Sequence, residues 1–493
     1  MLQATSNSMS ATESVDAVPL CVDLDGTLIY SDLLHESLAK LLGDRPQRIL
    51  RVPGWWRAGR AMLKHQVAQE VDLDMTRLPY RTDFLDWLRE QKAAGRSLWL
   101  TTASCEKYAQ AVADHLGLFD KVIASDAHHN RRGVTKIAAI REQAANGFDY
   151  AGDSDADVPI VQVCRRMVLV APSARLAAAA HEAGRVERVF GNTSDDTPEN
   201  TSRRGRGALL KLLRPHQWTK NLLVFVPLVA GHKLGELGLV FFAFLGFLAF
   251  CAAASAIYIV NDLVDIESDR VHQTKRKRPL AAGLVRIPVA MATAGVLLLA
   301  AGVLALMAGG AAFLGWVGIY LGLTTAYSFG LKRRVLVDVL LLAWLYTHRV
   351  MGGGVVVGIV LSHWLIAFSS FMFLSLAFVK RYAELSRTQE GEINHRRGYR
   401  LCDLPLIGSV GPSCGLAATL VLALYIQSDM SATLYHRPHM LWLMLPLVLF
   451  WILRVWLLAF RRELDEDPIT FAIHDRMSYV CLVAAVGVML LAS

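Results

Sequence analysis

The stretch VPLCVDLDGTLI, residues 18–29, places two carboxylates, Asp23 and Asp25, directly after a short apolar run. Gly26 follows them at once and allows the chain to turn tightly there. Four more short apolar runs come later, separated by helical patterns: RSLWLTTAS, DKVIASD, FDYAGDSD and RRMVLVAPS. Strand-like runs that alternate with helices are typical of a parallel sheet. The sequence therefore predicts an α/β domain over residues 1–189.

Polar residues close several of these runs, at the edge of a parallel sheet where ligands bind. Thr102 ends the second run, Lys136 begins a helical pattern, and Asp153 and Asp157 lie one helical turn apart in AGDSDADV. Phosphoryl transfer needs a nucleophile, an acid or base, cations that hold the phosphate, and Mg²⁺ on oxygen ligands. The set offers a candidate for each role, whereas DLDGT alone would also fit a simple turn.

This domain resembles the haloacid dehalogenase superfamily of phosphohydrolases through DLDGT, the threonine of LWLTTAS, the lysine of GVTK and GDSDAD. The resemblance implies that Asp23 is the phosphorylated nucleophile and Asp25 the general acid and base. Thr102, with Thr101 as the other choice in that segment, and Lys136 would bind the phosphoryl group. The implied ligands of Mg²⁺ are Asp23, Asp25, Asp153 and Asp157.

Roughly seventy mostly helical residues separate the first two motifs and include GWWRAGRAMLKHQVAQ, residues 54–69. They predict a small cap that shields the site and selects the substrate. Trp55 and Trp56 are expected in the core of this cap, and a surface that meets a membrane is the alternative. Residues 190–207 are rich in Asn, Thr, Ser and Asp and predict a flexible linker.

Residues 208–493 predict an all-α membrane domain of about nine transmembrane helices, because apolar stretches of about 20 residues recur along them. The formal charge of +8 gathers in clusters beside these stretches, at 275–278, 331–334 and 395–397. Clusters of this kind orient a chain and attract anionic membrane lipids, and they do not indicate nucleic-acid binding. We expect a bacterial plasma-membrane protein whose basic loops and soluble domain lie in the cytoplasm, where its seven scattered cysteines stay reduced.

The stretch NDLVDIESD carries four side chains with metal-binding oxygens: Asn261, Asp262, Asp265 and Asp269. On one continuous helix they would share a face and repel one another. One or two Mg²⁺ ions would compensate this charge, and Arg270, Lys275 and Arg278 follow closely enough to hold a diphosphate. The alternative is an acidic helix end that is merely solvated.

This region resembles the UbiA superfamily of intramembrane prenyltransferases through RPHQWTKN, YIVNDLVDIESDRVHQTKRKRPLAAG, AYSFGLKRRVLVDV and FVKRYAEL. Members that prenylate aromatic rings often carry a second motif of DxxxD type, whereas Asp338 here has no second Asp four residues later. The pattern looks more like the branch of decaprenyl-phosphate phosphoribosyltransferases. That resemblance assigns Mg²⁺ and the diphosphate to Asn261, Asp262, Asp265 and Asp269. It assigns phosphate contacts to Lys220, Arg278, Tyr327, Lys332 and Arg349, and to Lys380 and Arg381 unless these two are cytosolic anchors.

Together the resemblances imply a bifunctional, Mg²⁺-dependent membrane enzyme. Its membrane domain would transfer 5-phosphoribose from phosphoribosyl diphosphate to a polyprenyl phosphate, and its soluble domain would hydrolyse the 5-phosphate. One alternative is prenyl transfer from a polyprenyl diphosphate to an aromatic or other acceptor, with an independent phosphatase. A transporter with a regulatory domain is disfavoured, because the charges gather at the ends of spans. The sequence indicates neither the polyprenyl length nor the oligomeric state.

Overall fold

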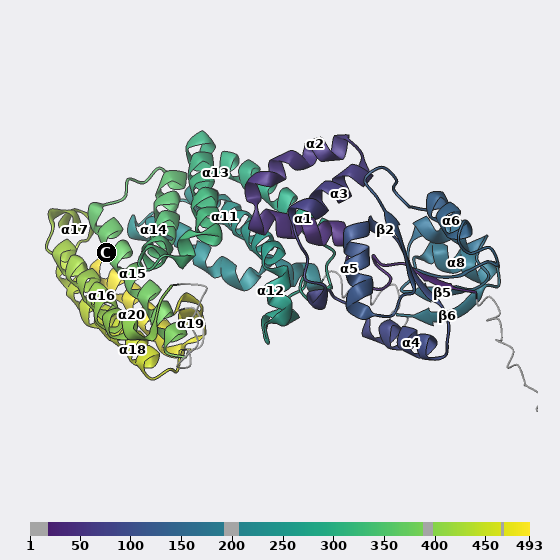
Figure 1. Cartoon of the computed structure of the whole chain (residues 1–493). Coiled ribbons are helices and arrows are strands. Elements are labelled where there is room, and N and C mark those ends of the chain that lie inside the picture. The colour runs from purple at the N-terminus through teal and green to yellow at the C-terminus, as the bar shows by residue number, and fades with distance from the viewer. Residues whose placement is uncertain (1–17, 192–206, 388–397, 465–467) are drawn as a thin grey trace, which may run out of the picture. The chain divides into compact units, whose positions relative to one another are not determined.

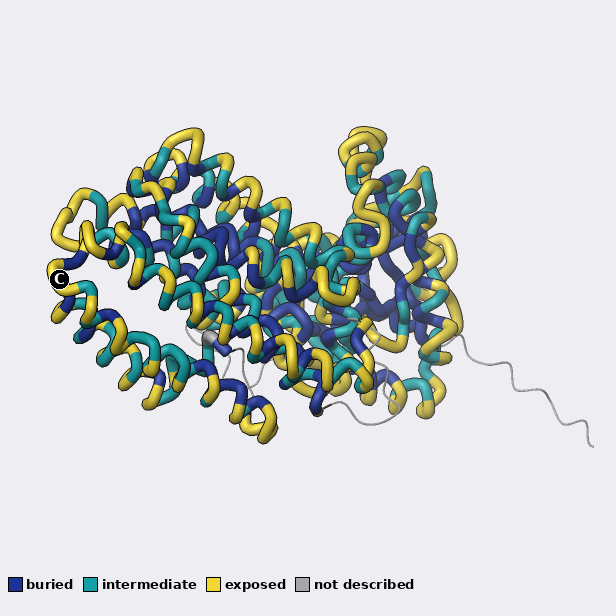
Figure 2. The backbone as a smooth tube through the Cα atoms, turned by 90° about the vertical axis from the view of Figure 1, so that its left-hand side faces the viewer, coloured by how far each residue is buried: buried dark blue, intermediate teal, exposed yellow. Residues whose placement is uncertain are grey.

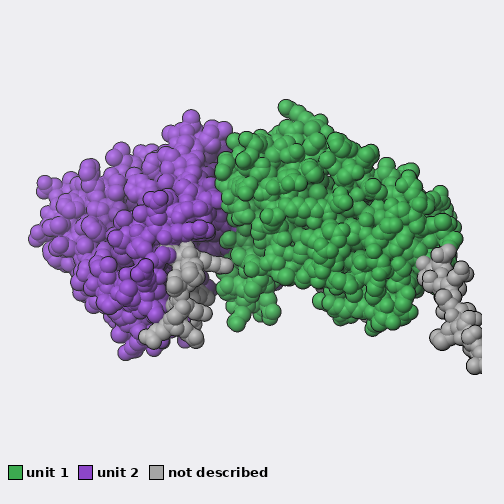
Figure 3. Space-filling view, viewed as in Figure 1, with its two compact units in different colours: residues 1–209, 262–290 green, residues 210–261, 291–493 purple. Residues whose placement is uncertain are grey.

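The computed structural model describes residues 18–191, 207–387, 398–464 and 468–493. The chain folds as two compact units, which Figure 3 shows in different colours. Unit 1 comprises residues 1–209 and 262–290, and unit 2 comprises residues 210–261 and 291–493. The predicted linker falls mostly on 192–206, which lie outside the described residues.

Unit 1 is built on a parallel sheet of six strands in the order β3-β2-β1-β4-β5-β6. The strands are β1 Leu20–Val22, β2 Leu98–Cys105, β3 Lys121–Ser125, β4 Asp149–Gly152, β5 Met167–Val170 and β6 Val186–Phe190. The five predicted strands are confirmed, and β6 is an additional one that takes in Phe190. Strand β1 pairs with both β2 and β4, so the strand order reverses there. A ligand site is expected where the order reverses, and this is where Asp23 leaves the sheet.

Helices cover the sheet and bury its central strand completely, because all three residues of β1 have no exposed surface. Figure 1 shows them around the strands, and they are α4 Thr82–Ala93, α5 Glu106–Leu116, α6 Val134–Arg141, α7 Val158–Val161 and α8 Ala174–Glu182. The predicted cap is also present, as α1 Leu33–Asp44, α2 Val52–Arg57 and α3 Arg60–Glu70.

The cap has a small apolar core of its own, formed around Leu41, Leu63 and Val67. Trp55 packs against this core, as predicted. Trp56 does not, since 65% of its surface is exposed, and the prediction that it is a core residue was wrong. Trp56 lies on α2, a helix of six residues that contains Pro53.

Residues 262–290 belong to unit 1, although they lie between two predicted membrane spans in the sequence. Helix α11, Leu237–Val264, ends here and the short helix α12, Ile266–Val271, follows. Two ion pairs attach α12 to α1: Arg270 with Glu36 at 2.6 Å, and Glu267 with Lys40 at 2.5 Å. Glu36 is buried, so its pairing with Arg270 is required to satisfy its charge.

Unit 2 is all helical, as predicted. Its elements are η4 Pro215–Phe225, α10 Val226–Ala230, most of α11, most of α13 Ile287–Phe329, α14 Val337–Val357, α15 His363–Leu385, α16 Leu404–Ile426, α17 Asp429–Leu434, α18 Met444–Phe460, α19 Pro468–His474 and α20 Arg476–Ala492. Figure 2 shows buried and exposed residues alternating along these helices. Many exposed positions carry large apolar side chains, as expected for helices that contact lipid.

Six helices in the described part of the chain are long and apolar enough to cross a membrane, and α20 is shorter. One of the six, α13, is interrupted by non-helical backbone at Gly309 and Gly310 and therefore consists of two helices. An integral membrane domain is thus confirmed, but the predicted count of nine spans is not.

Close helix packing in unit 2 depends on the glycines of α14. A Cβ atom on Gly353 would lie 2.2 Å from the carbonyl oxygen of Val224 in η4. That oxygen belongs to the backbone and cannot move aside as a side chain would. The small residues therefore let two backbones approach closely.

We predict that Gly353→Ala destabilises the protein by about 1–3 kcal/mol, the usual cost of overpacking a close contact. Thermal unfolding of the detergent-purified chain measures this as a lower Tm. Gly315→Ala in α13 is the matched control, because no atom lies within 4 Å of the added carbon. Equal melting temperatures for the two variants would contradict this account of the packing.

Candidate functional site

The centre of the site in unit 1 is the pair formed by Asp23 and Lys136. Asp23 follows β1, and one of its oxygens accepts a hydrogen bond from the Leu24 amide at 2.8 Å. The other oxygen lies 2.9 Å from Lys136 Nζ, which also donates to the hydroxyl of Tyr150 at 2.8 Å. Burial raises the pKa of Asp23, and the charge of Lys136 opposes that rise. The pair is a buried nucleophile candidate beside a fixed cation.

Asp23, Asp153 and Asp157 form a group of carboxylates, with one oxygen of each within 4.8 Å of the others. Asp157 accepts from the Tyr150 hydroxyl at 2.9 Å, and Asp153 accepts from the Thr27 hydroxyl at 3.1 Å. Burial and the neighbouring carboxylates raise the pKa of Asp153 to about 7. Lysine alone does not balance three carboxylates, and a divalent cation fits these hard oxygen donors.

Asp25 has different surroundings and its carboxylate lies outside the group of three, so its predicted part in metal binding stays a prediction. Its oxygens accept from the Leu33 amide at 2.9 Å and from the hydroxyl of Ser104. Burial raises the pKa of Asp25 to about 7, with a further contribution from the charge of Asp32. A carboxyl group with such a pKa can both give and take a proton near neutral pH.

The two threonines of β2 are both held by hydrogen bonds to residues of β1 and β2. Both Thr101 and Thr102 are fully buried. Thr101 donates to the Val22 carbonyl at 3.5 Å, and the Thr102 hydroxyl accepts from the Ser104 amide at 3.0 Å. Sequence reasoning missed Ser104, since a serine two positions past the motif gives no signal until β2 is seen to continue through it.

Gly26 is required in the turn after β1 for two reasons. Its φ is +80°, and a Cβ atom would lie 2.3 Å from an oxygen of Asp153. Its carbonyl oxygen accepts from Arg81 Nη2 at 3.1 Å, a contact that the sequence did not suggest. Gly26 thus allows the DLDGT motif to pack against the GDSDAD motif.

A cavity of about 650 Å³ opens over these residues. Its floor includes Asp23, Asp25 and Lys136, while residues of the cap and of the segment 266–288 form other parts of its wall. All of these residues belong to unit 1. The volume lies in the range of about 300–1,000 Å³ that is usual for small-molecule sites.

The acidic motif at the end of α11 is less regular than predicted. The helix is interrupted at Asp265, so the expected single helical face breaks there. Asp262 and Asp269 are buried and both contact Arg278, at 3.1 and 2.5 Å respectively, whereas Asp265 is half-buried. The three carboxylates do not form a compact metal-binding group within the part of the chain described. Asn261 is half-buried and belongs to unit 2.

The chemistry of these residues still suits a cation, although their carboxylates are not arranged as a compact ligand group among the described residues. Oδ1 of Asp269 is buried and has no hydrogen-bond partner among the described residues. Arg278 already lies between two of the carboxylates, in the position that the prediction gave to a metal. Either Arg278 or a divalent ion would neutralise the same excess of negative charge.

Two further polar clusters are buried in unit 2. In the first, Asp338 Oδ1 accepts from the Tyr327 hydroxyl at 2.9 Å and its Oδ2 pairs with Arg381 at 2.6 Å. The structure thus joins two predicted phosphate contacts through Asp338, whose role was missed because no partner stands near it in the sequence. Arg381 is buried, so it is not a surface anchor.

The second cluster surrounds Arg349, which donates to the side chains of Asn221 and Tyr320 at 2.7 and 3.0 Å. Lys220 is also buried, and it lies over the ring of Tyr346, as Arg349 does. These two predicted phosphate contacts are therefore close to one another. The remaining two, Lys332 and Lys380, are half-buried.

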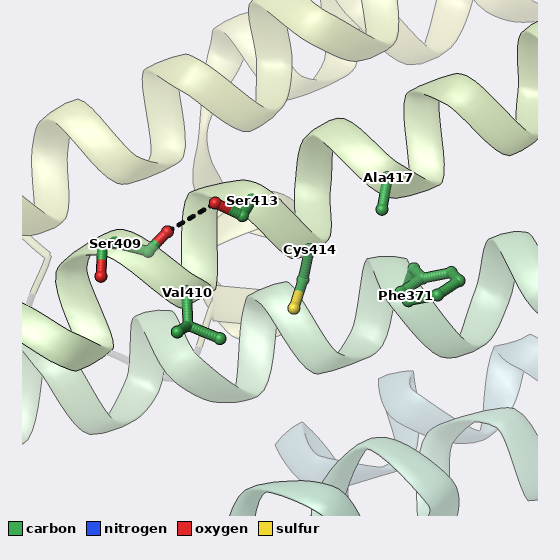
Figure 4. Close-up of a pocket in the computed structure, with 6 residues that line it drawn as sticks. All are labelled: Phe371, Ser409, Val410, Ser413, Cys414 and Ala417. Atoms are coloured by element: carbon green, nitrogen blue, oxygen red, sulfur yellow. Dashed lines mark hydrogen bonds between the residues drawn. The ribbon is translucent and has the colours of Figure 1, made fainter.

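A separate pocket of about 310 Å³ lies on α15 and α16 (Figure 4). The Ser413 hydroxyl donates to the Ser409 carbonyl at 2.8 Å in its wall. None of its lining residues is charged, so it offers nothing to a phosphate; they are Phe371, Ser409, Val410, Ser413, Cys414 and Ala417.

Two models of known protein families match this chain, one in its N-terminal part and one in its C-terminal part. The model of the UbiA prenyltransferase family matches residues 223–482, and that of haloacid dehalogenase-like hydrolases matches residues 20–162. The uncharacterized protein y4nM of Sinorhizobium fredii is 37% identical over 96% of this chain and 91% of its own length. The nodulation protein NoeC of Azorhizobium caulinodans is 32% identical, over 56% of this chain and 91% of its own.

A third relative is similar to the membrane part alone. The decaprenyl-phosphate phosphoribosyltransferase of Corynebacterium glutamicum is 37% identical over 186 residues, which cover 36% of this chain and 54% of that enzyme.

The carboxylate group predicts a specific metal-binding defect. Asp153→Asn removes one anionic ligand, so we expect divalent-cation affinity at this site to fall at least about tenfold. Titration of the full chain with Mn²⁺, followed by electron paramagnetic resonance, measures bound against free ion. Asp155→Asn is the control, because Asp155 is exposed and lies outside the group. Unchanged Mn²⁺ binding in Asp153→Asn would exclude this metal site.

Proposed function

We propose that this chain, which belongs to the UbiA prenyltransferase family and carries a haloacid dehalogenase-like hydrolase domain, is a bifunctional enzyme of lipid-linked sugar synthesis. Its membrane domain transfers 5-phosphoribose from phosphoribosyl diphosphate to a polyprenyl phosphate. Its soluble domain then removes the 5-phosphate. The observation that carries this proposal is the chemical fit of the two sites, since the first yields the phosphomonoester that the second hydrolyses.

The similarity to a decaprenyl-phosphate phosphoribosyltransferase supports the first reaction. An oxygen of the lipid phosphate attacks C1 of the ribose while the bond from C1 to the diphosphate oxygen breaks. The diphosphate leaves with the bonding electron pair, and Arg278 and nearby cations stabilise its charge. Bound Mg²⁺ would supply further charge neutralisation through Asn261, Asp262, Asp265 and Asp269. The lipid phosphate is already anionic and needs no base.

The geometry around Asp23 supports the second reaction. Its carboxylate attacks the phosphorus, the bond to the ribose 5-oxygen breaks, and Asp25 protonates that oxygen. Asp25 then takes a proton from water, which attacks the aspartyl phosphate and releases inorganic phosphate. Lys136, 2.9 Å from Asp23, holds the charge of the transferred group. Mg²⁺ on Asp23, Asp153 and Asp157 would neutralise the phosphate oxygens.

We place the chain in a bacterial plasma membrane with unit 1 in the cytoplasm, where phosphoribosyl diphosphate would be supplied. Basic clusters beside the spans support this orientation. A product released from one site meets a second site tethered to the same chain at an effective concentration of about millimolar. The arrangement would therefore favour immediate hydrolysis.

The alternative function is prenyl transfer from a polyprenyl diphosphate to an aromatic or other acceptor. The family to which the chain belongs favours it. It would use the same acidic motif but reverse which substrate carries the diphosphate. Asp338, the only acid where such members carry a DxxxD motif, is held by Arg381 and Tyr327.

The phosphatase step predicts an accumulating intermediate. The variant Asp23→Asn lacks the nucleophile, so purified protein given polyprenyl phosphate and phosphoribosyl diphosphate should build up the 5-phosphorylated lipid. Mass spectrometry of the extracted lipids measures the ratio of phosphorylated to dephosphorylated product. If the variant gives the same ratio as the wild type, the two reactions are not sequential.

The transferase step predicts that ribose enters lipid. Label from phosphoribosyl diphosphate should appear in the lipid fraction, and Asp262→Asn should reduce it about 100-fold or more, because charge stabilisation at the leaving group is lost. Asp429→Asn, an exposed acid of unit 2, is the control and should keep wild-type incorporation. Absence of label in lipid with the wild-type chain would favour prenyl transfer.

A further inference from the structure

The cavity of the hydrolase site is completed by a segment of the UbiA-like sequence. Its wall includes residues from 266–288, which connect α11 to α13. Among them Arg270 and Arg286 are cationic, and Leu280 and Val285 are apolar. A phosphatase that acted on any small phosphomonoester would not need a wall built from another domain's sequence.

This wall is fixed to the hydrolase fold by strong contacts. Both oxygens of buried Glu36 in α1 accept from Arg270, at 2.6 and 3.2 Å. Gly283 has a φ of +70°, and a Cβ atom there would lie 3.4 Å from Cβ of Tyr30. The segment therefore belongs to the site as closely as the cap does.

The chemistry of the cavity changes from its floor to its rim. The floor holds the nucleophile and Lys136, which suit one phosphoryl group. The rim carries three exposed arginines from three separate segments, Arg60, Arg132 and Arg286. No ion pair of their guanidinium groups is found among the described residues. Beside them lies the exposed ring of Trp56.

Arginines around a rim that form no ion pair with a described acid are suited to a second anionic group at a distance from the phosphate being cleaved. The exposed indole and its apolar neighbours offer a surface to a hydrocarbon chain. The cavity, at about 650 Å³, has room for more than a single phosphate.

We propose that the hydrolase site selects a lipid-linked phosphomonoester, and that Arg286 binds the phosphodiester joining sugar to lipid while Trp56 packs on the start of the chain. The inference rests on the proposed function and adds to it the basis of substrate choice. The UbiA-like segment thereby supplies a specificity residue to the hydrolase, and soluble sugar phosphates, which lack the phosphodiester, bind less tightly.

The test compares three substrates on the full-length chain in detergent: a short-chain polyprenyl phosphoribose 5-phosphate, ribose 5-phosphate and p-nitrophenyl phosphate. Arg286→Ala should raise KM for the lipid-linked substrate about tenfold, the loss expected for one charge-assisted contact. Its KM and kcat for the two soluble substrates should stay within twofold of wild type. Arg286→Lys should recover part of the loss.

Arg175→Ala is the control, because Arg175 lies on α8 of the same unit, is exposed and does not line the cavity. It should leave all three substrates unaffected. Equal effects of Arg286→Ala on lipid-linked and soluble substrates, or no effect on either, would overturn the inference.

These outcomes are separate from failure of the proposed function. That failure would appear in the wild-type chain, as absence of ribose transfer to lipid or absence of hydrolysis of the lipid-linked substrate. Hydrolysis of the lipid-linked compound that is indifferent to Arg286 would leave the proposed function standing and remove only the specificity claim.

Discussion

Buried carboxylates that need a cation are the constraint on which both candidate sites depend. At the hydrolase site Asp23 lies against Lys136, and in the segment 262–290 of the same unit Asp262 and Asp269 share Arg278. Ionised groups taken out of water are costly unless they are paired, and each of these sites is arranged around its pairing. The same excess of negative charge that holds the lysine or arginine side chain can also bind a divalent ion together with phosphate. Structure and chemistry therefore rest on one electrostatic arrangement.

The parallel sheet places this arrangement at a defined point. Strand β1 lies between β2 and β4, so the chain leaving it at Asp23 meets Asp153 after β4 and Ser104 near the end of β2. Gly26 then allows an approach that no other residue would permit. Asp23 and Asp25 are two positions apart but have different partners, one a lysine and the other a serine and an amide. This separation supports different roles for them, nucleophile and proton carrier.

The sequence was sufficient to predict the site residues that lie in local motifs or at the ends of strands. The runs ending at Asp23 and Gly152 were recognisable because strand ends meet at one edge of a parallel sheet. Sequence reasoning could not find Ser104, Arg81 or Tyr150, since nothing in their neighbourhoods indicates where their side chains point. It also treated 261–269 as one helix, because periodicity does not reveal the interruption at Asp265. Likewise, spacing alone could not show that Arg381 meets Asp338, 43 positions away.

The segment 262–290 contributes residues to two candidate sites at once. Its acids and Arg278 form the candidate diphosphate site, and its other residues form part of the hydrolase cavity wall. The Arg270–Glu36 pair joins this segment to the hydrolase cap, since Glu36 belongs to the cap and is nearly inaccessible to water. A carboxylate so deeply buried is stabilised by its pairing with an arginine. The hydrolase cap of this chain is therefore joined to the UbiA-like sequence by a buried ion pair as well as by the chain itself.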